Sequence, residues 1–147
     1  MKNYSDYTDP IDEAIEKNID PVWDLNLYMA SHPELGGQEY EASRRMKDML
    51  EKSGFAITYP YCNIPTSFNA QRGQRGPSVA LLAEYDALPE IGHGCGHCLH
   101  GSMTLLAGLA LSPLLERIPG ILYVIGTPSE ETNGAKVTLA KNGVFDS

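Results

Sequence analysis

The densest chemistry in the sequence lies in residues 92–100, GHGCGHCLH, which hold three of the four histidines and two of the three cysteines. Cysteine thiolate and neutral imidazole are preferred donors for Zn²⁺ and similar divalent ions. The glycines of this segment let the backbone bend, so that Cys95 and His97 can reach one ion. The spacing therefore favours a metal site over a polar loop whose histidines only bond to the backbone.

Two adjacent acids, Glu130 and Glu131, follow an apolar run at residues 121–125. A metal hydrolase needs one carboxylate to hold the ion and a second, unligated one to move a proton from water to the leaving amine. Alone, such a pair is more typical of a solvated helix start, where the helix dipole favours acids. Its place at the same predicted sheet edge as the Cys/His segment favours the catalytic interpretation.

Asp86 stands just after another apolar run, residues 79–83. A carboxylate there would suit the orientation of a ligand imidazole. A loop cap explains the same residue equally well, so both interpretations stay open.

The elements that must position these groups can be predicted from apolar spacing and from helix start and stop signals. Asp9-Pro10 and Asp20-Pro21 both resemble helix starts, which indicates either one kinked helix or two. The pattern predicts further helices at residues 39–52, 99–115 and 134–141, strands at 55–59, 67–72, 79–83 and 121–125, and a turn at 71–77. The strand at 79–83 reads as buried on both faces. This order predicts one α/β domain over residues 1–147, with a mainly parallel sheet flanked by helices and ligands at the carboxyl ends of the strands.

The composition narrows the class of protein. Nineteen acidic against eleven basic residues give a net charge of -8, which opposes binding to nucleic acid or to anionic lipid surfaces. The apolar stretch at residues 103–115 is shorter than the roughly 20 residues that a bilayer span requires. The polar N-terminus, from Met1 to Asp6, lacks the apolar core of a secretory signal, and three cysteines argue against a disulfide framework. We therefore expect a cytoplasmic protein.

Three motifs in order, AEYDALP at residues 83–89, GHGCGH at 92–97 and GTPSEE at 126–131, resemble the M20 family of metallopeptidases and amidohydrolases. The similarity is greatest to the aminobenzoyl-glutamate hydrolase group, beside aminoacylases and hippurate hydrolases. The upstream stretch HPELGGQE at residues 32–39 also resembles that family's start. The resemblance implies a zinc-peptidase-like (phosphorylase/hydrolase-like) α/β fold into which a lid and dimerisation domain is inserted.

The resemblance also implies a chemistry and its residues. Cys95, His97 and Glu131 would ligate one or two Zn²⁺ or Mn²⁺ ions, and Glu130 would be the general base. Asp86 matches the carboxylate of the first motif, and the duties of His93 and His100 are open. The substrate would be a small amide, such as an N-acyl amino acid, aminobenzoyl-glutamate or a dipeptide.

Two departures from the family pattern matter. Cys98 stands where the family has Asp or Asn, which bears on the geometry of the ion. The sequence ends at Ser147, before the lid domain and the remaining ligand histidines, so we expect these 147 residues to be inactive alone and a homodimer only for a full-length protein.

Two alternatives belong to other classes of protein. Cys95-Gly96-His97-Cys98 has the spacing of a thioredoxin-like dithiol oxidoreductase, in which a helix start would lower the pKa of Cys95. A non-catalytic fragment could instead hold a closed tetrahedral zinc site with Cys95, His97, Cys98 and His100.

Overall fold

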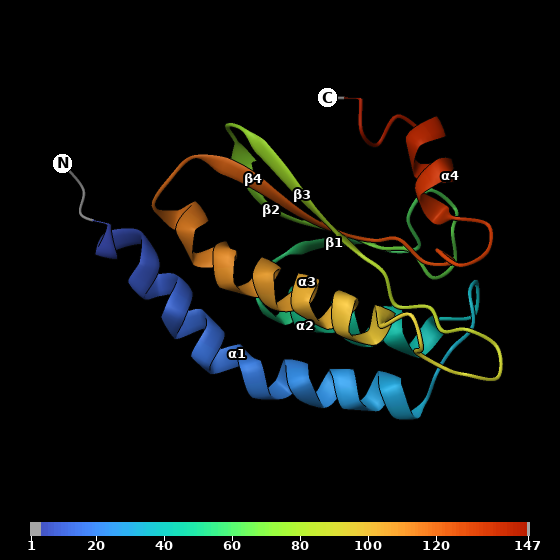
Figure 1. Cartoon of the computed structure of the whole chain (residues 1–147). Helices are drawn as coiled ribbons and strands as arrows, with labels where there is room; N and C mark the ends of the chain where they lie inside the picture. Colours follow the sequence, from blue (N-terminus) through green and yellow to red (C-terminus); the bar gives the residue numbers. More distant parts are fainter. Residues whose placement is uncertain (1–3, 147) are drawn as a thin grey trace.

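The computed structural model describes residues 4–146, in which helices lie along one face of a four-stranded sheet (Figure 1). Residues 1–3 of the polar N-terminus and residue 147 lie outside the described part. The elements are α1 (Ser5–Ser31), α2 (Tyr40–Lys52), β1 (Ala56–Thr58), β2 (Asn69–Arg75), β3 (Ser78–Ala83), α3 (His97–Leu111), the 3₁₀ helix η1 (Ser112–Glu116), β4 (Gly120–Gly126) and α4 (Ala135–Lys141). The predicted α/β class with flanking helices is confirmed.

The sheet is mixed, with the strand order β1-β2-β4-β3. Only β3 and β4 are parallel, as expected for strands joined through the helix α3, whereas β1 pairs with β2 and β2 with β4 in antiparallel fashion. The prediction of a mainly parallel sheet is therefore wrong in its pairing. The error arises at residues 71–77, which were predicted as a turn, because residues 71–75 belong to β2. Only Gly76 and Pro77 separate β2 from β3, so the chain reverses direction there.

The strand β3 lies at one edge of the described sheet and is not buried on both faces, which corrects the sequence-based expectation. Val79 is 55% exposed, and burial is complete only at Ala83, where the strand runs under α3. The helix α1 also resolves an open alternative, because it continues through Pro21 as one helix. Burial of Val22, Leu25 and Met29 beneath it compensates for the hydrogen bond that the proline removes.

Two glycines let α3 approach the sheet closely. A Cβ atom on Gly101 would lie 2.6 Å from the backbone oxygen of Glu84, and a Cβ atom on Gly108 would lie 2.5 Å from Val124 Cγ2. The two positions are seven residues, or two turns, apart and so share one helix face, with the fully buried Leu105 between them. This contact fixes the start of α3 beside the carboxyl ends of β3 and β4.

The continuous helical stretch His97–Glu116 is long and apolar enough, by length and composition alone, to cross a membrane. This helical stretch is longer than the apolar run at residues 103–115, so length does not exclude a membrane span, as the sequence had suggested. Its buried residues include Leu105, Leu109 and Ala110, and α1 packs along it. These contacts are those of a core helix, and the expectation of no membrane partner stays a prediction.

A candidate metal centre

Cys95, His97 and Glu131 converge beyond the carboxyl ends of β3 and β4. Their ligand atoms lie within 4.8 Å of one another, and within residues 4–146 they form one group of metal-ligating side chains. His97 is the first residue of α3, Cys95 lies two residues before it, and Glu131 lies in the turn after β4. The structure thus brings together the three ligands that the sequence suggested.

The glycines of the Cys/His segment have a local structural cause. Gly92 and Gly96 adopt φ values of 64° and 84°, in the left-handed region that L side chains avoid. Gly96 directly precedes α3, so its conformation turns the chain sharply into the helix. This bend places Cys95 and His97 on the same side of the loop.

Asp86 orients His97. Its carboxylate is fully buried, and Oδ1 lies 3.1 Å from His97 Nδ1, while the backbone oxygen of Asp86 lies 3.2 Å from the same atom. A carboxylate and a carbonyl only accept, so Nδ1 carries the proton and Nε2 keeps a lone pair for an ion. Asp86 Oδ2 also accepts the backbone N–H of Glu131 at 3.0 Å. Asp86 thus makes the contacts that each of the two open interpretations predicts, one with the imidazole and one with the turn that carries Glu131.

His93 and His100 have the opposite tautomer. Nδ1 of His93 accepts the backbone N–H of Cys98, and Nδ1 of His100 accepts that of Glu84, both at 3.2 Å. A ring that accepts at Nδ1 carries its proton on Nε2, which then has no lone pair for an ion. Burial, assisted by the nearby His97, lowers the pKa of His93 and favours this neutral form. Of the three clustered histidines, only His97 therefore has a free lone pair.

Three carboxylates surround His97 Nε2. Glu84 Oε2 lies at 3.2 Å, Glu130 Oε2 at 3.9 Å and Glu131 Oε1 at 4.0 Å. Glu84 belongs to the first motif, but sequence reasoning gave it no role. The available signal was its position two residues before Asp86 at the end of an apolar strand. No local feature of the sequence indicated that Lys136 of α4 pairs with Glu84.

Cys95 and Cys98 differ in environment. Burial raises the pKa of the Cys95 thiol, and the neighbouring Glu131 raises it further. Burial likewise raises the pKa of Cys98, which packs in the hydrophobic core. An activated dithiol needs a lowered pKa, so the oxidoreductase alternative gains no support. The closed zinc site gains none either, because Cys98 faces the core and Nδ1 of His100 is occupied.

Glu39 holds the turn that carries the two acids, a role that sequence reasoning missed. It is fully buried, its Oε1 accepts the backbone N–H of Ser129 at 2.7 Å, and its Oε2 accepts the hydroxyl of Thr66 at 2.9 Å. Ser129 has a φ of 59°, unusual for a residue other than glycine, and this bond stabilises it. The sequence showed Glu39 only as a helix start.

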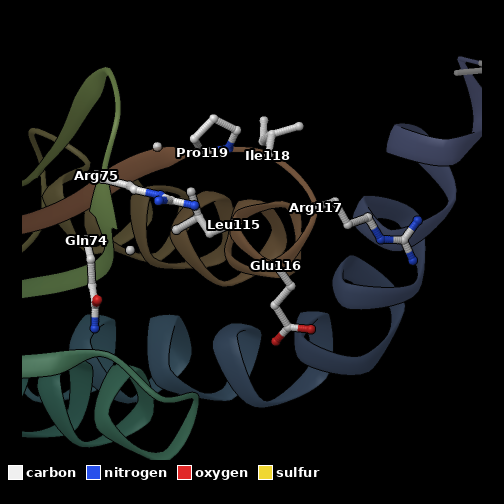
Figure 2. A pocket seen from close by; sticks show the side chains of 9 residues that line it. Gln74, Arg75, Leu115, Glu116, Arg117, Ile118 and Pro119 are labelled. Atoms are coloured by element: carbon white, nitrogen blue, oxygen red, sulfur yellow. The ribbon is translucent and has the colours of Figure 1, made fainter. Parts of the chain in front are cut away.

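A cavity of about 560 Å³ lies away from these residues, at the opposite end of β4 (Figure 2). Its lining includes Arg75, Glu116 and Arg117, beside Leu115 and Ile118. These groups offer no cluster of metal-ligating side chains. The chemistry of the chain is therefore concentrated at the carboxyl ends of the strands.

The donor set of the cluster fits a divalent cation. It offers a thiol, an imidazole whose Nε2 lone pair is free, and a carboxylate, a combination typical of zinc sites. Burial and then a hydrogen bond with Glu131 raise the pKa of the Cys95 thiol. A cation would replace that proton and balance the negative charge that gathers there.

Comparisons with known proteins identify the family of this chain. Residues 80–147 match the model of peptidase family M20/M25/M40. The chain is 35% identical over 155 residues to one subunit of the p-aminobenzoyl-glutamate hydrolase of Escherichia coli K12, covering 92% of this chain and 32% of that protein. It is 36% identical over 150 residues to the Xaa-Arg dipeptidase of Mus musculus, covering 92% of this chain and 34% of that protein. The chain thus spans about a third of the length of the curated relatives it matches.

Solved structures agree. The YXEP protein of Bacillus subtilis, described as a dinuclear metal binding peptidase from the M20 family, superposes with a TM-score of 0.75 at 25% identity, over 86% of this chain and 40% of that one. A putative aminohydrolase from methicillin-resistant Staphylococcus aureus shares the fold, with a TM-score of 0.81 at 22% identity, over 94% of this chain and 39% of that one. Motifs, fold and relatives agree, and the chain belongs to peptidase family M20/M25/M40.

Proposed function

We propose that this chain forms part of the catalytic centre of a metal-dependent amidohydrolase or peptidase. The substrate would be an amide in an N-acyl amino acid, aminobenzoyl-glutamate or a small peptide. One observation carries the proposal: the donor atoms of Cys95, His97 and Glu131 meet within 4.8 Å, while the adjacent Glu130 stays outside that group. Such an arrangement separates the ligands from the base.

Each residue has a distinct duty in this proposal. Cys95, His97 and Glu131 hold a Zn²⁺ or Mn²⁺ ion, and the thiolate favours Zn²⁺. The bound ion supplies Lewis-acid activation of water and of the amide carbonyl. Glu130 Oε2 lies 3.9 Å from His97 Nε2 and is exposed enough to meet substrate, so it takes a proton from water and delivers it to the leaving amine. Asp86 keeps His97 in the ligating tautomer.

The names of two relatives support the substrate class. A p-aminobenzoyl-glutamate hydrolase and an Xaa-Arg dipeptidase both act on an amide bond to an amino acid, which leaves through its amine. The leaving group that Glu130 would protonate here is of the same kind. A small amide is consequently the substrate class we propose for this site.

The test is ion binding by the parent chain and by Cys95→Ser, His97→Gln and Glu131→Gln, measured by equilibrium dialysis with Zn²⁺ and Mn²⁺. We expect uptake by the parent and weaker binding in each variant, since each loses one donor. A matched surface variant, Glu116→Gln, should bind as the parent does. No uptake by the parent, or uptake by all three ligand variants equal to that of the parent, contradicts the proposal.

Other expectations stay proposals. The lack of turnover by these 147 residues alone can be checked by assaying release of an amino acid from N-acyl amino acids. We also propose a cytoplasmic location and a homodimer for a full-length form of the protein.

A further inference from the structure

The motif HPELGGQE has no part in the function proposed above. Its residues 33–39 connect α1 to α2. They are not a free loop, because a parallel bridge joins Leu35 to Ala87, and the Ala87 N–H donates to the backbone oxygen of Glu34 at 2.8 Å. Ala87 directly follows Asp86, the acid that orients the ligand imidazole. The connection therefore pairs with the chain beside the metal centre.

Gly36 of this connection lies against Asp86 and against the turn that carries the paired acids. A Cβ atom at this position would lie 2.8 Å from Thr132 Oγ1, 3.2 Å from Ser129 Cα and 3.5 Å from Asp86 Oδ2. The same Asp86 oxygen accepts the backbone N–H of Glu131 at 3.0 Å. Gly36 therefore packs beside the hydrogen bond that links Asp86 to the turn.

The two ends of the connection reach the other parts of the centre. At its start, Pro33 lies beside Gly92, where an added Cβ atom would be 3.7 Å from the proline ring. Gly92 is the first residue of the Cys/His segment. At its end, Glu39 Oε1 accepts the backbone N–H of Ser129 at 2.7 Å. One short connection thus contacts all three motifs that supply the centre.

Glycine is needed at position 36 for space rather than for backbone conformation. Gly37 has a φ of 82°, in the left-handed region, whereas Gly36 lies outside that region. The Thr132 hydroxyl could rotate away from an added methyl group, but Ser129 Cα belongs to the backbone and would have to shift by a few tenths of an ångström. Ligand distances in metal sites hold to within about 0.2 Å, so a shift of that size is large enough to disturb the centre.

We propose that residues 33–39 position the metal centre, and that Gly36 sets the separation between Asp86 and the turn that carries the paired acids. This inference rests on the proposed metal-dependent function. Gly36 is a positioning residue, since it offers no ligand atom and acts through the backbone of the turn. The hydrogen bonds at Ala87 and Ser129 hold the connection at both ends, so a displacement at Gly36 is passed on to the turn.

Gly36→Ala tests this assignment. The added methyl group should push the turn away from Asp86, so we expect the folded variant to bind Co²⁺ about tenfold more weakly than the parent. Changes in the groups that orient metal ligands typically cost about 10–100-fold in affinity. Dissociation constants come from competition with a chelating indicator at fixed ionic strength. Gln38→Ala, at an exposed position of the same connection, is the matched control and should bind as the parent does.

Thr132→Ala provides a rescue that a general loss of stability would not show. It removes the hydroxyl nearest to the added methyl group. We expect Gly36→Ala/Thr132→Ala to bind Co²⁺ more tightly than Gly36→Ala does. Thr132→Ala alone should bind as the parent does, because its hydroxyl contacts the Ser129 oxygen only at 3.5 Å. The ligand-field bands of bound Co²⁺, which report the coordination geometry, should change in Gly36→Ala and return toward those of the parent in the double variant.

Glu39→Asp provides a second variant should Gly36→Ala not fold. The side chain is shorter by one methylene, which draws the acceptor away from the Ser129 N–H and loosens the same turn without adding an atom at position 36. We again expect weaker binding of Co²⁺. Circular dichroism checks the folding of each variant, and urea unfolding measures stability separately from affinity.

The outcomes separate the two proposals. If folded Gly36→Ala binds Co²⁺ as tightly as the parent, or if Gln38→Ala is weakened equally, the positioning role is overturned, even where stability is lower. If Gly36→Ala does not fold, unchanged affinity in Glu39→Asp overturns it. In either case, loss of binding in His97→Gln would still support the proposed function. A parent chain that takes up no Co²⁺ overturns both proposals.

Discussion

Asp86 Oδ1 lies 3.1 Å from His97 Nδ1, and the same carboxylate accepts the backbone N–H of Glu131. One buried acid therefore positions two proposed ligands that come from different elements. This link couples the position of the loop before α3 to that of the turn after β4.

Asp86→Asn tests this link. The amide can turn its NH₂ group toward His97 Nδ1, which would move the ring proton to Nε2 and block the ligand lone pair. We expect affinity for Zn²⁺ to fall about 10–100-fold. Isothermal titration measures it, with the exposed Asp24→Asn as a control. Unchanged affinity would show that His97 is oriented by something else.

Glu130→Gln separates the base from the ligands. The amide cannot accept a proton from water, so in any form of the protein that hydrolyses an amide we expect turnover to fall about 10²–10⁴-fold. Ion binding should be retained, because Glu130 lies outside the ligand group. Parallel assays of amino acid release and zinc content check both. Loss of the ion together with turnover would instead make Glu130 a ligand.

Ion binding should release a proton from Cys95. Burial and Glu131 raise the pKa of this thiol above its ordinary value, so it is protonated at neutral pH, whereas the ligand form is the thiolate. We expect about one proton per ion at pH 7, measured in weakly buffered solution, and none from this source in Cys95→Ser. Alkylation of metal-free Cys95, followed by mass spectrometry, should be slow at pH 7. Rapid alkylation there would instead favour the dithiol alternative.

Glu39 gives a pH dependence of defined sign. Burial is the main cause that raises the pKa of Glu39 above 4.5, so the folded chain binds this proton more tightly than the unfolded chain does. The corresponding stability is complete below about pH 4.5 and is lost as the pH rises through the folded pKa, by about 1.4 kcal/mol for each unit of the shift. Glu39→Gln lacks that loss and should gain stability relative to the parent between pH 4.5 and 8. Urea unfolding across this range measures the difference in the free energy of unfolding between the variant and the parent. A difference that does not change with pH would contradict the prediction.

Gly101→Ala should destabilise the chain. The added Cβ atom would lie 2.6 Å from the backbone oxygen of Glu84, which cannot move away as a flexible side chain could. We expect a loss of about 1–3 kcal/mol from overpacking, against which the helix preference of alanine returns at most about 1 kcal/mol. Urea unfolding measures it, with the exposed Met103→Ala as control on the same helix. Equal or greater stability would mean that α3 can move outward at no cost.

The sequence predicted the helices and strands well where apolar spacing agreed with a start or stop signal. The helix before Gly54 and the strand that precedes Glu130 were predicted within a few residues, because apolar periodicity and a stop signal coincide there. The sequence did not predict which strands pair or which strand lies at the edge of the sheet. A run such as residues 79–83 is apolar whether a strand lies at the centre or at the edge, so the exposure of Val79 could not be foreseen.

The candidate site was foreseeable only in part, for a related reason. Cys95, His97 and Glu131 stand out because thiol, imidazole and paired acids are rare in such density. Glu39 is separated from Ser129 by 90 positions, and Glu84 from Lys136 by 52, so no local pattern links them. Contacts between elements that are distant in sequence arise only from the folded arrangement.

The glycine face of α3 has a consequence for how this protein tolerates change. Cys95 and His97 lie at the start of the helix α3, whereas Asp86 and Glu131 follow strands of the sheet. Gly101 and Gly108 set the distance between this helix and the sheet. Adding a single methyl group at either glycine would separate the two halves of the centre without altering any reactive atom. Damaging substitutions can therefore arise at residues that carry no functional group at all.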